Sequence, residues 1–323
     1  MANVNVVVTC TKGKTRKPSL ELQLGDVSAA TPEERASLWI ARLEKARGEK
    51  TRAFDLYSGD HWSVVRSLPA AAARSGSDVQ LWICSAGYGL IRADTQLHPY
   101  SATFSNPNPD QVHRFSGISR REAHRRWWAT LTQWAGPQRG APRTIREIAE
   151  RQPETPIVVV GSESYVDPIA ADLRSTAGVL HSPDQLVILS AGTGRMAGLE
   201  SNLASYDARL NRLLSGALMS LNVRVARELL EWGVEISTGE VNEWLADFGR
   251  EVPRFEYPVR DRLSDDQVKA FIRGELTADP NVRWTSLHKK LRRELHLACE
   301  QKRFRDLFFT VRAEPDAQET PPS

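Results

Sequence analysis

Residues 81–94 read LWICSAGYGLIRAD and are followed closely by His98 and Tyr100. The stretch begins as a short apolar strand and breaks at Gly87 and Gly89, which permit backbone conformations closed to other residues and a close approach to a ligand. A strand that ends in a glycine turn with polar side chains behind it is typical of an α/β active site. A tight turn carrying solvated polar residues is the other interpretation, and periodicity alone does not separate the two.

Three more apolar runs extend this strand into a sheet. Residues 4–8, 156–160 and 186–189 are almost continuously apolar and rich in β-branched side chains, as strands buried on both faces are. Helical stretches separate the four runs, so we predict an α/β fold with a four-stranded parallel sheet, flanked by helices and joined by right-handed crossovers. The expected helices cover residues 32–48, 62–75, 119–134, 144–151, 168–175, 203–232 and 241–248.

The chain then changes character near residue 253. Residues 253–258 predict an extended linker, because two prolines flank two aromatic residues. Helices are expected at 264–274 and 285–298, and residues 301–309 form either a strand or a third helix. We therefore predict an α/β catalytic domain over 1–252, a basic helical module over 253–313 and a disordered tail over 314–323, which is rich in Pro, Glu and Asp.

Composition limits the class of protein. The chain has 323 residues, of which 41% are hydrophobic and 26% charged, as in ordinary soluble proteins. No apolar run approaches the roughly 20 residues that cross a bilayer, and the N-terminus lacks the features of a signal peptide. The three cysteines have no metal-ligand spacing, so we expect reduced thiols, a cytoplasmic location, no metal and no membrane partner.

Basic residues are concentrated in two places, although the net charge is only +3. Nine basic and three acidic residues lie between Arg283 and Arg312, and a second basic run leads into Trp127 and Trp128. Such clusters favour a polyanion partner, although charge runs are more often solvated faces. The candidate DNA-binding residues are Arg125, Arg126, Lys289, Lys290, Arg292, Arg293, Lys302 and Arg303.

Four small polar loops follow the four predicted strands, at residues 9–12, 85–89, 161–165 and 190–195. Because parallel strands end at one edge of a sheet, these loops should converge on a binding crevice. The glycine-rich residues 192–198 follow the last strand, so we interpret them as a phosphate-binding turn or a plain turn, and not as a dinucleotide fingerprint. The sequence carries no nucleophile elbow, P-loop, HExxH or CxxC motif.

Several of these residues also occur in a known order. Cys10 and Lys12, residues 56–59 (LYSG), residues 85–90 and Asp94, and finally Pro99 with Tyr100 resemble the YaaA-like family over roughly residues 4–200. Gly87 departs from the pattern, because many relatives carry lysine there. The resemblance implies a core like that of uracil-DNA glycosylase, binding to DNA and, by similarity to a phage-defence member, excision of glucosylated hydroxymethylcytosine.

The first hypothesis that follows is a DNA glycosylase that acts on phage double-stranded DNA without a cofactor. Such an enzyme extrudes its base, stacks it on aromatic rings and directs water at the sugar. Asp94, with Glu163 as the second candidate, would orient the water or face the developing positive charge. The candidate substrate-binding residues are Lys12, Ser85, Tyr88, Gly89, Tyr100, Ser162, Tyr165, Thr193 and Arg195.

Two other hypotheses remain open. The basic C-terminal module fits equally well a DNA-binding stress-response protein with no chemistry, of the kind that the family resemblance also implies. A nucleotide or nucleoside hydrolase would use the crevice but leave the basic module without a role.

Overall fold

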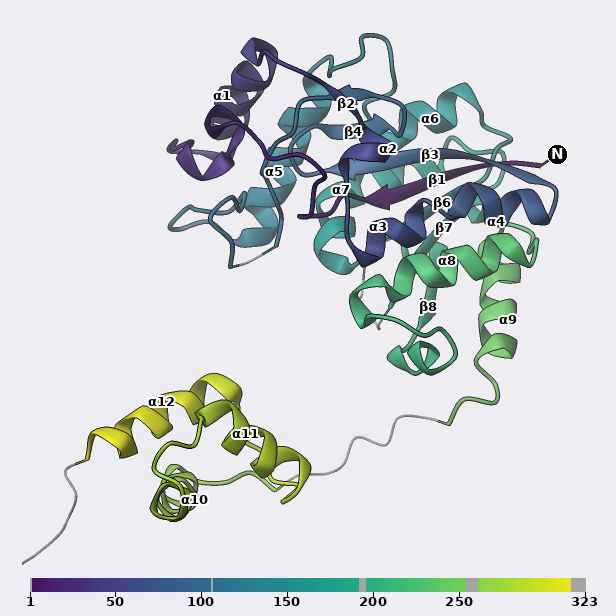
Figure 1. The fold of residues 1–323 in the computed structure, drawn as a ribbon. Helices are drawn as coiled ribbons and strands as arrows, with labels where there is room; N and C mark the ends of the chain where they lie inside the picture. Colours follow the sequence, from purple (N-terminus) through teal and green to yellow (C-terminus); the bar gives the residue numbers. More distant parts are fainter. Residues whose placement is uncertain (1, 106, 192–195, 254–260, 315–323) are drawn as a thin grey trace, which may run out of the picture. The chain divides into compact units, whose positions relative to one another are not determined.

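The computed structural model describes residues 2–105, 107–191, 196–253 and 261–314, in two compact units, Met1–Pro253 and Arg254–Ser323 (Figure 1). The division lies one residue beyond the boundary predicted at residue 252. Each unit has its own cluster of buried hydrophobic side chains, and the two clusters share no residue. Each unit is therefore described by itself.

The first unit is built around a six-stranded sheet with the order β4-β3-β1-β6-β7-β8 (Figure 1). All four predicted strands are present, and neighbours among them run parallel, as expected. Their side chains are mostly buried in the segments that the sequence identified. These four strands are β1 (Ala2–Thr9), β3 (Ser77–Ser85), β6 (Ile157–Val160) and β7 (Leu186–Ala191).

Two further strands correct the prediction of four. β4 (Gly89–Arg92) folds back antiparallel on β3, so the sheet is mixed. β8 (Leu203–Tyr206) pairs parallel with β7, in a stretch that was wrongly predicted as helix. Ala204 and Tyr206 are buried while Ser205 is exposed, which is the period of a strand. Only the end of the predicted helix 203–232 is regular α-helix, as α8 (Leu221–Glu231).

Helices cover both faces of the sheet (Figure 1). On one face, α5 (Arg120–Gln133) contacts α1 (Pro32–Lys45) and α7 (Glu163–Ala177), and α7 contacts α6 (Ile145–Arg151). On the other face, α8 packs on β6 and β7 and contacts α3 (Asp60–Val65) and α4 (Leu68–Arg74).

Further elements complete the unit. α9 (Thr238–Phe248) packs against β8. A two-stranded ribbon of β2 (Thr51–Arg52) and β5 (Gln96–Leu97) contacts the short helix α2 (Ala53–Leu56).

The starts of three helices follow from their caps. The side chains of Thr31, Ser119 and Thr144 each accept a hydrogen bond from the backbone N–H of a glutamate three residues later, at 3.1–3.2 Å. This satisfies one of the free N–H groups of the first turn. The predicted single helix 62–75 is two helices instead: α3 ends at Val65, and α4 begins at Leu68 with Pro69 in its first turn, where a missing N–H is tolerated.

Over residues 261–314, the described part of the C-terminal unit forms three helices, α10 (Asp265–Ala278), α11 (Trp284–Arg293) and α12 (Gln301–Ala313). Residues 301–309 are thus helical, and not a strand. Leu287 and Leu291 are buried as expected, but Leu295 is 46% exposed because α11 ends before it. Glu314, expected in the disordered tail, pairs with Arg273 at 2.9 Å, and residues 315–323 lie outside the described residues.

Within the described part of the chain, no helix combines the length and the apolar character needed to span a membrane.

Candidate active site at the carboxyl edge of the sheet

The parallel strands β1, β3 and β6 end side by side. Thr9, the last residue of β1, pairs with Cys84 of β3, and Val8 pairs with Val160, the last residue of β6. The segments that follow these strands therefore start at one edge of the sheet, which we call the carboxyl edge. They are the loop from Cys10 to Lys14, the turn at residues 86–88 and the first turn of α7.

A chain of three buried hydroxyl groups lies at this edge. The Tyr57 hydroxyl is 3.0 Å from the Tyr100 hydroxyl, which is 2.7 Å from Ser85 Oγ. Ser85 Oγ in turn accepts hydrogen bonds from the backbone N–H groups of Gly87 and Tyr88, at 3.3 and 3.0 Å. Burial raises the pKa of both Tyr57 and Tyr100, so these phenols keep their protons at neutral pH. A connected chain of this kind can hold or pass a proton.

The amine of Lys14 lies over the aromatic rings of this hydroxyl chain. Its Nζ lies 4.4 Å from the centroid of the Tyr100 ring and 5.6 Å from that of Tyr57, and donates to the carbonyl of Thr11 at 3.1 Å. Burial lowers the pKa of Lys14, although Cys10 and Asp110 act in the opposite direction. Lys14 forms no ion pair with any residue that the structure describes. An amine of this kind gives up its proton more readily than an exposed lysine does.

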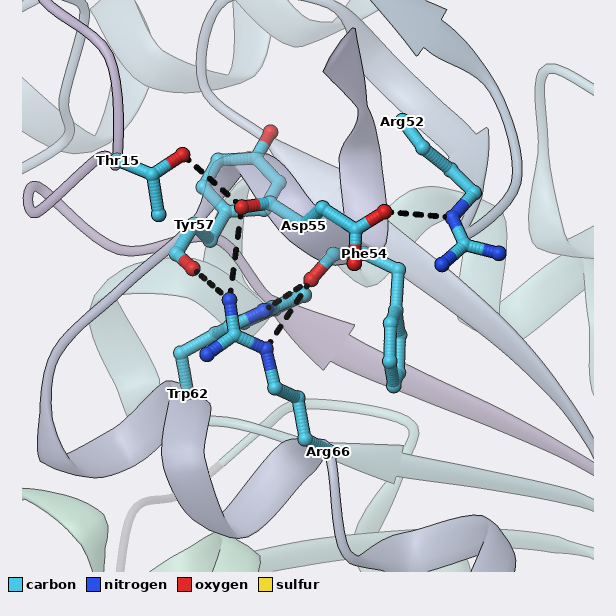
Figure 2. A network of polar contacts seen from close by, with 7 residues as sticks. All are labelled: Thr15, Arg52, Phe54, Asp55, Tyr57, Trp62 and Arg66. Atoms are coloured by element: carbon cyan, nitrogen blue, oxygen red, sulfur yellow. Dashed lines mark hydrogen bonds and ion pairs between the residues drawn. The ribbon is translucent and has the colours of Figure 1, made fainter.

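Three side chains from two parts of the chain hold the segment that carries Tyr57 (Figure 2). Arg66 donates to the carbonyl of Tyr57 at 2.8 Å, and Trp62 donates to the carbonyl of Phe54 at 2.8 Å. Thr15, just beyond the loop that carries Lys14, donates to the carbonyl of Asp55 at 3.0 Å. These bonds fix the position of Tyr57 relative to the loop of Lys14, as a preorganised site requires.

Two more polar groups reach the same edge. Cys10 Sγ is 3.7 Å from the hydroxyl of Tyr165 and accepts from the backbone N–H of Ala86 at 3.5 Å. The ring of His61, on α3, contacts the backbone of Thr9, and its buried Nε2 has no hydrogen-bond partner among the described residues. Burial lowers the pKa of His61, so the ring is neutral at pH 7.

The first turn of α7 brings three predicted residues to the carboxyl edge. Ser162 precedes the helix, with its Oγ 3.0 Å from Ser164 Oγ, and Tyr165 reaches Cys10. Glu163 is half exposed and forms an ion pair with Arg121 of α5. Among the two predicted catalytic carboxylates, Glu163 is thus the one at this edge.

Asp94 lies elsewhere, which corrects the expectation that it belongs to the crevice. In the β3–β4 hairpin Gly89 pairs with Ser85 and Arg92 pairs with Trp82, so the chain has run back toward the amino ends of the strands before it reaches Asp94. There Asp94 pairs with Arg92 at 2.9 Å, is 54% exposed and lines a cavity of about 540 Å³ together with Asp78 and other residues from the amino side of the sheet.

The glycines of the turn, predicted to allow a close approach to a ligand, instead make room for neighbouring side chains of the protein. A Cβ on Gly87 would lie 2.4 Å from Tyr100 Cε2, and one on Gly89, where φ is +72°, would lie 2.7 Å from Arg143 Nη2. The space beside them is filled by the protein's own side chains, and not left for a ligand. Tyr88 and Tyr100 are 3% and 0% exposed, so neither offers a free face for stacking a base.

The remaining predicted residues fall into three groups. Lys12 is exposed in the loop before Lys14, and Thr193 and Arg195 lie outside the described residues. Ion pairs hold Arg125 to Asp167 at 2.6 Å, Lys290 to Glu275 at 2.6 Å and Arg303 to Asp265 at 2.5 Å, and Arg126 is paired with Glu33. Four of the predicted cations are exposed and form no ion pair with any described residue: Lys289, Arg292, Arg293 and Lys302.

The sequence prediction missed Lys14, Tyr57 and His61 as site residues. Lys14 lies two residues beyond Lys12, and Tyr57 lies in the segment 56–59 that carries part of the family resemblance, but nothing in the sequence indicates that these side chains meet. Among the described residues, no group of three or more His, Cys, Asp or Glu side chains is placed to hold a metal ion.

Comparisons with protein-family models, with curated proteins and with solved structures found no match to this chain.

Proposed function

We propose that the protein is a DNA glycosylase with a core of the uracil-DNA-glycosylase type, and that its active site is the cluster at the carboxyl edge. The observation that carries the proposal is the buried chain of Tyr57, Tyr100 and Ser85 beneath the amine of Lys14. Buried polar groups cost stability unless they are paired, and a concentration of them with perturbed pKa values is characteristic of functional sites.

The proposed reaction breaks the bond between the sugar and a modified cytosine, the glucosylated hydroxymethyl form in phage DNA. The base leaves with the bonding electrons, and water adds to the sugar carbon and loses a proton, which leaves an abasic site. Glu163 is the carboxylate that would accept this proton or face the positive charge that develops on the sugar. Lys14, in its charged form, would face the negative charge that develops on the departing base.

The test is abasic-site formation on glucosylated, hydroxymethylated and unmodified DNA, with free nucleosides as a fourth substrate. We expect release of the base from glucosylated DNA, and a loss of at least about 100-fold in Lys14→Met and Glu163→Gln, the usual effect of removing an acid–base or charge-stabilising group. Asp94→Asn is the matched carboxylate control and should stay within about twofold of the wild type, since surface changes are nearly neutral.

Two results would overturn this assignment. An inactive Asp94→Asn variant that is still folded, together with an active Glu163→Gln variant, would move the chemistry to the amino side of the sheet. A wild-type protein that releases no base from any DNA would remove the glycosylase activity itself, and activity confined to free nucleosides would point to a nucleoside hydrolase.

A non-catalytic DNA-binding protein is the second candidate, because of Lys289, Arg292, Arg293 and Lys302. These four exposed cations of α11 and α12 have no carboxylate partner among the described residues, so they are available to phosphates. Binding through them should weaken with salt, with a slope of log K against log salt of about −0.9 for each phosphate neutralised. Salt-dependent binding without any base release would favour this candidate.

A further inference from the structure

A second cavity is lined in part by Tyr88 and by none of the three residues of the hydroxyl chain, and the proposed reaction does not use it. Its volume is about 660 Å³, within the range of pockets that hold small ligands. It is bordered by the end of α1, the loop that follows α1, the β5 segment and the segment after α5. The residues that carry the argument are Glu44, Arg47, Lys50, His98, Trp134 and Arg139.

One wall of the cavity is aromatic and firmly held. Trp134 is partly exposed and stacks on Tyr88, with ring centroids 6.2 Å apart and an interplanar angle of 30°. The buried Arg143 donates to the carbonyl of Trp134 at 3.0 Å and to that of Tyr88 at 2.5 Å, and so ties both residues together. The indole N–H of Trp134 donates to Glu44 at 2.8 Å. A planar ligand would meet a surface that is already ordered.

Three cationic side chains also line the cavity. Arg47, Lys50 and Arg139 are exposed, line the cavity and form no ion pair with any residue in the described ranges. Glu44 is the one carboxylate among the lining residues, and it is engaged by Trp134. Burial lowers the pKa of His98, and the nearby charges of Lys50 and Arg47 lower it further.

We propose that this cavity binds a nucleotide, with the base against Trp134 and the phosphate held by Arg47, Lys50 and Arg139. An aromatic platform beside unpaired cations is the combination that recognises a base and its phosphate. A sugar phosphate would leave the aromatic wall unused, and an uncharged aromatic compound would leave the cations unused. The ligand could be a free nucleotide or one unpaired nucleotide of a DNA strand, and these share the same chemistry.

The experiment titrates the full-length protein by calorimetry with four probes: a nucleoside monophosphate, the matching nucleoside, inorganic phosphate and a short single-stranded oligothymidylate. We expect the monophosphate to bind more tightly than the nucleoside or phosphate. Lys50→Glu, Arg139→Glu and Trp134→Leu should each weaken binding by at least about tenfold, while Trp134→Tyr keeps a stacking ring and most of the affinity. Lys17→Glu is the matched control, an exposed lysine outside the cavity.

The two sources of the nucleotide are separated by the same titrations. Tighter binding of the oligonucleotide, lost in the same three variants, assigns the cavity to a DNA strand, and tighter binding of the monophosphate assigns it to a free nucleotide. The inference fails if none of the probes binds at millimolar concentration, or if the variants bind as the wild type does. Base release in the glycosylase assay is scored separately, so either proposal can fail alone.

Discussion

At the residue scale, the surroundings of Lys14 both stabilise and destabilise its charged amine. Its amine stays over the rings of Tyr57 and Tyr100, where the cation–π attraction is favourable, but the surrounding protein removes it from water. No carboxylate within the described ranges forms an ion pair with it to offset this cost. A residue kept in such a position is more easily explained by function than by stability.

The substitution Lys14→Met should therefore stabilise the protein by about 1 kcal/mol while it abolishes base release, the usual trade between activity and stability. The gain should shrink at high pH. Because burial lowers the pKa of Lys14 below its unfolded value of 10.5, the unfolded chain binds more protons between the two values, and the wild type gains stability as pH rises through that window. Urea unfolding of both proteins at pH 7 and pH 10 measures this.

The control for this prediction is Lys12→Met, which removes an exposed amine from the same loop. Its free energy of unfolding should differ from that of the wild type by no more than about 0.5 kcal/mol at either pH. A Lys14→Met variant less stable than the wild type would mean that the amine serves mainly to hold the loop of Thr11 and Lys12.

At the scale of the element, the β3–β4 hairpin determines which side chains lie at the carboxyl edge of the sheet. The backbone of Gly87 is not in the left-handed region, so only a steric clash opposes a larger residue there. The absence of a Cβ at Gly87 makes room for the ring of Tyr100. Gly87→Ala should thus cost about 1–3 kcal/mol, the usual price of overpacking a core, and should shift the Tyr100 hydroxyl away from Ser85. Urea unfolding measures the first effect, and the rate of base release measures the second.

Gly239→Ala is the control, because nothing lies within 4 Å of a Cβ there and the residue sits in α9. It should leave the protein unchanged or stabilise it by up to about 1 kcal/mol, since alanine is the better helix former. A Gly87→Ala variant as stable as the wild type would show that Tyr100 can move aside without cost.

The same hairpin shows which parts of the fold could be predicted from the sequence and which could not. Continuous apolar runs identified β1, β3, β6 and β7, and capping residues such as Ser119 identified helix starts, because burial and end effects are local signals. The reversal of the chain at Gly87–Gly89 was not predicted, because the same glycine turn can lead either into a loop or into an antiparallel strand. That single ambiguity is enough to move Asp94 from one end of the sheet to the other. The meeting of Lys14 with Tyr57 and Tyr100 depends on tertiary packing, which no local pattern contains.

At the scale of the whole molecule, the chain carries two separate hydrophobic cores. Trp127 and Leu173 belong to the core of the first unit, and Phe304 and Phe308 to that of the second. The smaller C-terminal unit buries a smaller share of its surface than the larger α/β unit does, and so has the smaller reserve of stability. The proposed active site lies wholly in the first unit, and the candidate DNA-binding cations Lys289, Arg292, Arg293 and Lys302 lie in the second.

Phe304→Ala should consequently remove about 3–5 kcal/mol from the second unit alone, because Phe304 is fully buried in the core there. Calorimetry should show two transitions in the wild type, of which only the one belonging to the C-terminal unit is lowered or lost. Leu173→Ala, fully buried in the first unit, should lower only the other. If the basic unit holds the DNA and the α/β unit releases the base, Phe304→Ala weakens binding but keeps base release at saturating DNA. Loss of both transitions in either variant would mean that the units unfold as one.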